Sequence, residues 1–135
     1  MAQKAVVLVV EDEAIIRMGA VEMLEEAGFE VVEAGNAHEA VSILERRSDV
    51  CAIFTDINMP GTMDGMRLAR MVRGRWPPIH LIVTSGLMSP NDDDLPPGGK
   101  FIRKPYDPKH VIATLRELLG HFPPSDPIEQ ATKAA

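Results

Sequence analysis

The chain has 135 residues, of which 45% are hydrophobic and 25% are charged, a composition typical of one globular domain with its own core. No apolar run approaches the ~20 residues that a membrane-spanning helix needs, and a formal net charge of −6 opposes binding to a nucleic-acid backbone. We therefore expect no membrane attachment and no direct nucleic-acid partner. The N-terminus lacks a signal-peptide pattern, and the single cysteine, Cys51, excludes an intrachain disulfide, so a cytoplasmic location is expected.

Five short runs rich in apolar residues predict five β-strands. They lie at residues 5–10, 29–34, 50–55, 79–84 and 100–104. The first run is apolar without alternation, which is the pattern of a strand covered on both faces within a parallel sheet.

The segments between these runs have helical patterns. Residues 13–27 place four apolar side chains on one expected core stripe, and glycine 28 can end that helix in a left-handed conformation. The stripe consists of Ile15, Met18, Val21 and Leu24. Met23 also has the spacing of a core residue.

Three further helices have recognisable starts. Asn36 followed by Glu39 resembles a capping box, and Asp64 can cap a helix that begins at glycine 65. Asp107 followed by proline opens a last helix, which ends at Gly120. Residues 88–99 are rich in proline and glycine, so a helix there should be short or irregular.

Alternating strands and helices of these lengths predict an α/β fold, a doubly wound five-stranded parallel sheet with helices on both faces. Residues 1–120 form the expected domain. Residues 121–135 offer little to bury, so we expect a disordered tail.

Polar residues follow the strands at one edge of the expected sheet. Glu11 and Asp12 follow the first strand, Asp56 the third, Thr84 ends the fourth, and Lys104 lies at the end of the fifth. Ligands of open α/β sheets bind at this carboxyl edge. Carboxylates crowded in this way repel one another and need a cation, and Mg²⁺ is a cation that prefers oxygen ligands. Such an ion would leave one Asp free to attack phosphorus. The hydroxyl of Thr84 and the ammonium group of Lys104 would hold the phosphoryl oxygens.

Ordered motifs at these positions carry a family resemblance. They are Val9-Val10-Glu11-Asp12-Glu13, Asp56-Ile57-Asn58-Met59-Pro60, Asp64-Gly65, Thr84-Ser85-Gly86 and Lys104-Pro105-Tyr106. Over roughly residues 5–120 the chain resembles the receiver domains of two-component response regulators. The resemblance implies a flavodoxin-like sheet with strand order 2-1-3-4-5 and a cis peptide bond before Pro105.

The resemblance also implies a role for each site residue. Asp56 would be the phosphoacceptor, and Asp12, Asp56 and the backbone carbonyl of Asn58 would bind Mg²⁺, with Glu11 acting through a water molecule. Thr84 and Lys104 would contact the phosphoryl group. Phe101 corresponds to the switch aromatic of the family, whose ring moves as Thr84 approaches the phosphate.

The expected function is that of a stand-alone receiver in a phosphorelay. It would take a phosphoryl group from a sensor histidine kinase or a histidine phosphotransfer protein, then switch binding to an unknown downstream protein or relay the phosphate. Apart from dephosphorylating itself, it would turn over no separate substrate. The sequence departs from the family in one extra residue before Asp64 and in the poor helical pattern of residues 88–99.

Two alternatives remain open at this point. A haloacid dehalogenase-like phosphatase also combines a nucleophilic Asp, a hydroxyl residue, a Lys and Mg²⁺, although its nucleophile follows its first strand and usually reads Asp-x-Asp. An unphosphorylated receiver-like interaction module is the second alternative, and the intact set of acidic, hydroxyl and lysine residues argues against it.

Overall fold

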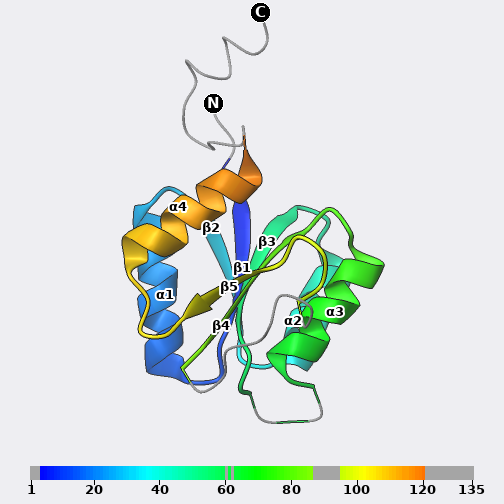
Figure 1. Ribbon diagram of the computed structural model, residues 1–135. Helices are drawn as coiled ribbons and strands as arrows, with labels where there is room; N and C mark the ends of the chain where they lie inside the picture. Colours follow the sequence, from blue (N-terminus) through cyan, green and yellow to red (C-terminus); the bar gives the residue numbers. More distant parts are fainter. Residues whose placement is uncertain (1–3, 60, 62, 87–94, 121–135) are drawn as a thin grey trace, which may run out of the picture.

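A five-stranded parallel sheet with strand order β2-β1-β3-β4-β5 forms the centre of the computed structural model (Figure 1). The structure describes residues 4–59, 61, 63–86 and 95–120. The strands are β1 (Val6–Val10), β2 (Glu30–Ala34), β3 (Val50–Asp56), β4 (His80–Ser85) and β5 (Lys100–Arg103). The helices are α1 (Ala14–Glu26), α2 (Ala37–Arg46), α3 (Gly65–Arg75) and α4 (Pro108–Leu119). The predicted fold class and strand order are confirmed.

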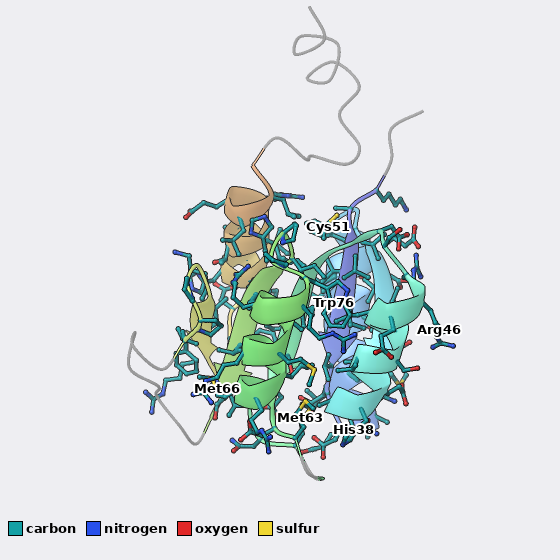
Figure 2. All side chains as sticks on the ribbon, turned by 90° about the vertical axis from the view of Figure 1, so that its right-hand side faces the viewer. His38, Arg46, Cys51, Met63, Met66 and Trp76 are labelled. Atoms are coloured by element: carbon teal, nitrogen blue, oxygen red, sulfur yellow. The ribbon has the colours of Figure 1, made fainter. Side chains whose placement is uncertain are left out.

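Two helical layers cover the two faces of the sheet. Helices α1 and α4 lie on one face, and α2 and α3 lie side by side on the other (Figures 1 and 2). Each layer buries an apolar cluster against alternate residues of β1, which contribute Val7 and Val9 to one face and Leu8 and Val10 to the other. All five residues of β1 are buried, as the unbroken apolar run predicts.

Helix α1 departs from the predicted packing. Ile15 and Met18 are 85% and 60% exposed, whereas Ala20 and Leu24 are the buried residues of this helix. The expected core stripe is therefore wrong in its first half. The helix has apolar residues on several faces, so periodicity alone could not identify the side that faces the sheet.

The predicted helix starts are confirmed by their capping hydrogen bonds. The side chains of Asn36, Asp64 and Asp107 accept from the backbone N–H groups of residues 39, 67 and 109, respectively. Gly28 follows α1 with φ of 99°, a conformation that glycine adopts without strain.

Two expectations concern segments that the structure describes only in part or not at all. Of the region expected to hold a short or irregular helix, only residues 95–99 are described, and there the amide of Gly99 donates to the carbonyl of Pro96. The expected disordered tail, residues 121–135, lies outside the described residues. Within the described parts of the chain, no helix has the length and apolar character needed to cross a membrane.

Helix α3 runs from the carboxyl edge of the sheet toward the opposite edge. Its first turn contains Met66, whereas Trp76 follows its last turn, and the two lie at opposite ends of the helix (Figure 2). The carboxyl edge, where the strands end and the predicted site lies, is thus separated from Trp76 by the length of the helix.

Candidate functional site

The strand register brings the predicted site residues to one edge. Asp56, the last residue of β3, is paired with Thr84 of β4. On the other side of β3, β1 runs into Glu11, whose amide donates to the carbonyl of Ala34 at 3.1 Å. The amide of Lys104 likewise donates to the carbonyl of Ser85 at 3.1 Å, which extends the sheet pattern beyond β5.

Three carboxylates form the acidic part of the site. Glu11, Asp12 and Asp56 each offer one oxygen within 4.8 Å of the others. Glu11 and Asp56 are buried and Asp12 is exposed. These donors are hard oxygen ligands, the type that Mg²⁺ prefers, and their mutual repulsion favours a bound cation. The residues present therefore fit a divalent ion.

Lys104 lies between two of these carboxylates. Its Nζ is 3.1 Å from Glu11 Oε1 and 3.3 Å from Asp56 Oδ2. Burial lowers the pKa of Lys104, but the hydrogen bond to Glu11 and the charges of Asp56 and Glu11 together outweigh that effect and raise it. The lysine therefore carries its positive charge at neutral pH.

Burial raises the pKa of Glu11, and the charge of Asp56 acts in the same direction. The hydrogen bonds from the amide of Glu13 and from Lys104 oppose this shift. Glu11 is thus an ionisable group whose charged form depends on a nearby cation for its stability.

Thr84 contributes a buried hydroxyl group to the site. Its Oγ1 is buried and makes no hydrogen bond among the described residues. Such a group costs stability unless it finds a partner, so it is available for an oxygen-rich ligand beside Asp56. The amide of Asn58 donates to Asp56 Oδ1 at 3.4 Å.

Two contacts at the site have no clear signal in the sequence. Asn58 Nδ2 donates to Ser85 Oγ at 3.0 Å, which ties the loop after β3 to the end of β4. The chain then returns so closely that a Cβ atom on Gly65 would lie 2.0 Å from the carbonyl oxygen of Asp56. The Asp64-Gly65 motif marked this position in the sequence. Only the fold shows the reason for the glycine, which is that any side chain here would collide with the backbone of Asp56, the candidate phosphoacceptor.

Two aromatic residues lie in β5 and just after it. Phe101 is half-buried in β5, pairs in register with Val83 and packs against the core on the α2 and α3 side. Tyr106 packs edge-to-face on Phe54, with ring centroids 5.4 Å apart, on the α4 side. The peptide bond between Lys104 and Pro105 is cis, as expected.

The response regulator receiver domain model matches residues 7–116. The chain therefore belongs to the receiver domain family of two-component response regulators. This match does not favour the phosphatase alternative.

Similar proteins agree with this assignment. The chain is 38% identical over 119 residues to the sensor kinase CckA of Brucella abortus. The matched region covers 85% of this chain and 12% of that kinase. It is 33% identical over 132 residues to the phosphate regulon regulator PhoB of Pseudomonas aeruginosa, covering 91% of this chain and 56% of that regulator. The chain thus spans only part of these relatives.

Solved structures show the same fold. The receiver domain of the hybrid histidine kinase CckA superposes with a TM-score of 0.72 at 30% identity, covering 84% of this chain and 98% of that one. A response regulator receiver protein from Sinorhizobium medicae superposes with a TM-score of 0.81 at 25% identity, covering 86% of this chain and 94% of that one.

Proposed function

We propose that the carboxylate of Asp56 accepts a phosphoryl group and that this modification is the signal carried by the domain. The observation that supports this most is the position of Asp56 at the end of β3, where its Oδ2 lies 3.3 Å from Lys104 Nζ. Its register partner Thr84 has a buried hydroxyl group with no hydrogen-bond partner in the part of the chain that the structure describes. A positive charge and a hydroxyl donor are thus gathered around one nucleophilic carboxylate. This is the set that a phosphoryl group on that carboxylate would need.

In the proposed step an Asp56 oxygen attacks phosphorus while the P–N bond of a phosphohistidine breaks. The bonding electrons leave with the imidazole nitrogen, which is protonated after release. Lys104 holds one phosphoryl oxygen by charge, and the Thr84 hydroxyl donates to another. Attack of water on the acyl phosphate returns Asp56 to its carboxylate and releases inorganic phosphate.

Asp12, Asp56 and the backbone carbonyl of Asn58 would hold Mg²⁺, with Glu11 acting through a water molecule. The ion supplies positive charge that lets an anionic phosphodonor approach the carboxylates. The ammonium group of Lys104, which lies between Glu11 and Asp56, supplies part of that positive charge from the chain itself.

Thr84 and Phe101 would transmit the modification. Movement of the Thr84 hydroxyl toward a phosphoryl oxygen displaces the end of β4, and Val83 in that strand is the register partner of Phe101. The ring of Phe101 would follow, which changes the surface beside β5.

The phosphodonor would be a sensor histidine kinase or a histidine phosphotransfer protein in the cytoplasm, and the output would be altered binding of a downstream protein or transfer of the phosphate. We place the receiver unit in residues 1–120. It would turn over no separate substrate beyond loss of its own phosphoryl group.

The test is intact-mass measurement after incubation with phosphoramidate and Mg²⁺. The unmodified chain should gain one phosphoryl group, and Asp56→Asn should gain none. Asp49→Asn is the matched control, because Asp49 precedes β3 at the opposite edge and pairs there with Arg47.

The control should be labelled like the unmodified chain. If no variant is labelled in Mg²⁺, the unphosphorylated interaction module is the better description. If Asp56→Asn is labelled as strongly as the unmodified chain, another residue is the phosphoacceptor.

A further inference from the structure

Arg17 of α1 connects three segments at the carboxyl edge. Its Nη1 donates to the backbone carbonyl of Glu11 at 2.7 Å, and its Nε donates to Glu33 Oε1 at 3.1 Å. Its Nη1 also lies 3.4 Å from the position that a Cβ atom would take on Gly35. The side chain is 22% exposed, so the guanidinium group is largely enclosed by the segments that it joins.

The backbone of Glu11 is consequently held on both sides. Its amide donates to the carbonyl of Ala34, and its carbonyl accepts from Arg17. The Glu11 side chain is held as well, by the amide of Glu13 and by Lys104.

Asp12 differs from Glu11 in this respect. Asp12 is exposed, and within the described residues no hydrogen bond or ion pair fixes its carboxylate. The direction of its side chain therefore depends on the peptide unit that joins it to Glu11. The carbonyl of that peptide unit is the group that Arg17 binds.

We propose that Arg17 is a positioning residue for the cation site: by fixing the Glu11 carbonyl, it aims the Asp12 carboxylate toward Asp56 and thereby increases affinity for Mg²⁺. This inference rests on the proposed function, because it takes Asp12 to be a ligand of the ion. Arg17 itself contacts neither the ion nor the phosphoryl group.

Electrostatics alone predicts the opposite effect. A guanidinium group bound to the Glu11 backbone carbonyl repels a divalent cation held by the neighbouring acidic side chains, so removal of its charge should tighten cation binding. Loss of positioning should weaken binding, since residues that orient metal ligands commonly change affinity by about 10-fold to 100-fold when mutated. The direction of the change therefore separates the two roles.

The experiment measures the binding of Mn²⁺, as a paramagnetic substitute for Mg²⁺, from the electron paramagnetic resonance signal of the free ion. Arg17→Gln should raise the Kd about tenfold. Arg17→Lys keeps the charge but lacks the forked donor, so its Kd should rise by a smaller factor. Mg²⁺ should displace Mn²⁺ from all forms of the protein.

Two variants serve as controls. Arg116→Gln makes the same charge change at an arginine that also donates to a backbone carbonyl, that of Ala27, but on α4. Glu33→Gln removes the ion-pair partner of Arg17 and leaves the bond to Glu11. Both should bind Mn²⁺ within about twofold of the unmodified chain, because neither removes the contact to the Glu11 carbonyl.

A kinetic readout separates positioning from general damage to the fold. At saturating Mg²⁺ the phosphorylation rate of Arg17→Gln should return to within about twofold of the unmodified value, because only the cation affinity is changed. A rate that stays low at saturating Mg²⁺ would contradict the positioning role.

The outcomes are distinguishable from failure of the proposed function. A Kd for Arg17→Gln equal to or lower than that of the unmodified chain overturns the role of Arg17 while leaving the cation site intact. Absence of Mn²⁺ and Mg²⁺ binding by the unmodified chain overturns the proposed cation site itself, and the role of Arg17 with it. Circular dichroism of each variant establishes that the folded protein is being compared.

Discussion

The two edges of the sheet handle charge in opposite ways. At the carboxyl edge Glu11, Asp56 and Thr84 are buried, and Lys104 is the cation that lies between the two carboxylates. At the amino edge the ion pairs are solvent-exposed, as in Arg75 with Glu45, whose side chains are 49% and 52% exposed. Exposed pairs contribute little to stability, whereas buried groups are costly unless partnered. The buried polar and charged groups of the carboxyl edge therefore lower the stability of the fold, and a bound ion or phosphoryl group would offset part of that cost.

The largest expected effect comes from filling the space at Gly65. In Gly65→Ala the new Cβ would lie 2.0 Å from the carbonyl oxygen of Asp56, so β3 must shift at the site. We expect a loss of about 3 kcal/mol in the free energy of unfolding and loss of phosphorylation, measured by urea unfolding and intact mass.

Gly74→Ala is the matched control, since no atom of the described residues lies within 4 Å of a Cβ atom there. It should stabilise the protein by about 0.5 kcal/mol, because alanine favours the helix. Equal effects of the two substitutions would contradict the close approach at Gly65.

Removal of the positive charge of Lys104 should have the next largest effect. Lys104→Met leaves buried Glu11 without its ion-pair partner, so we expect a loss of about 2 kcal/mol without added Mg²⁺. Added Mg²⁺ should restore part of this loss, because it supplies positive charge to the same carboxylates. Urea unfolding with and without Mg²⁺ measures both effects.

Arg75→Met breaks the exposed pair at the amino edge and should cost about 0.5 kcal/mol, with no response to Mg²⁺. Equal losses of unfolding free energy in Lys104→Met and Arg75→Met would contradict the contrast between the two edges.

A smaller effect of opposite sign is expected at Thr84. Thr84→Val removes a buried hydroxyl group that has no partner among the described residues, so the unfolding free energy should rise by about 1 kcal/mol while phosphorylation slows. Thr55→Val is the control, because the Thr55 hydroxyl donates to the carbonyl of Asp56 at 3.0 Å and its loss should cost about 1 kcal/mol. Thermal unfolding of both variants tests the pair, and destabilisation of Thr84→Val would show that its hydroxyl is satisfied.

The smallest effect concerns pH and the amino edge. Burial, and then the charge of Arg73, lower the pKa of His80 below its ordinary value of 6.5. The unfolded chain therefore binds a proton that the folded chain resists, so stability falls as pH drops below 6.5. His80→Gln should make this decline shallower in urea unfolding between about pH 7 and 5. A decline in His80→Gln as steep as that of the unmodified chain would contradict this prediction.

Local sequence rules predicted most of the fold because they act through the backbone. A few consecutive residues suffice to predict the strand or the helix start in each case. The examples are the unbroken apolar run of β1 and the caps at Asn36, Asp64 and Asp107. The outward position of Ile15 and Met18 could not be predicted in this way. The side of α1 that faces the sheet is decided by packing, and Ala20 and Leu24 fill that space.

The candidate site follows the same division. The strand-end rule placed Glu11, Asp56, Thr84 and Lys104 at one edge, and the register confirms their proximity. Two features of the site depend on distances between different segments of the fold. They are the Thr84 hydroxyl, which has no hydrogen-bond partner among the described residues, and the hydrogen bond from Arg17 to the Glu11 carbonyl. Such distances exist only once the sheet is assembled.

The position of the phosphoryl group tests the central proposal most directly. The protein is phosphorylated with phosphoramidate and Mg²⁺, reduced with borohydride, which converts an aspartyl phosphate to homoserine, and sequenced by tandem mass spectrometry. We predict homoserine at position 56 alone, and only in the sample that contained Mg²⁺. Homoserine at Asp12 or Asp64 instead, or the same product at position 56 in the presence of a chelator, would contradict it.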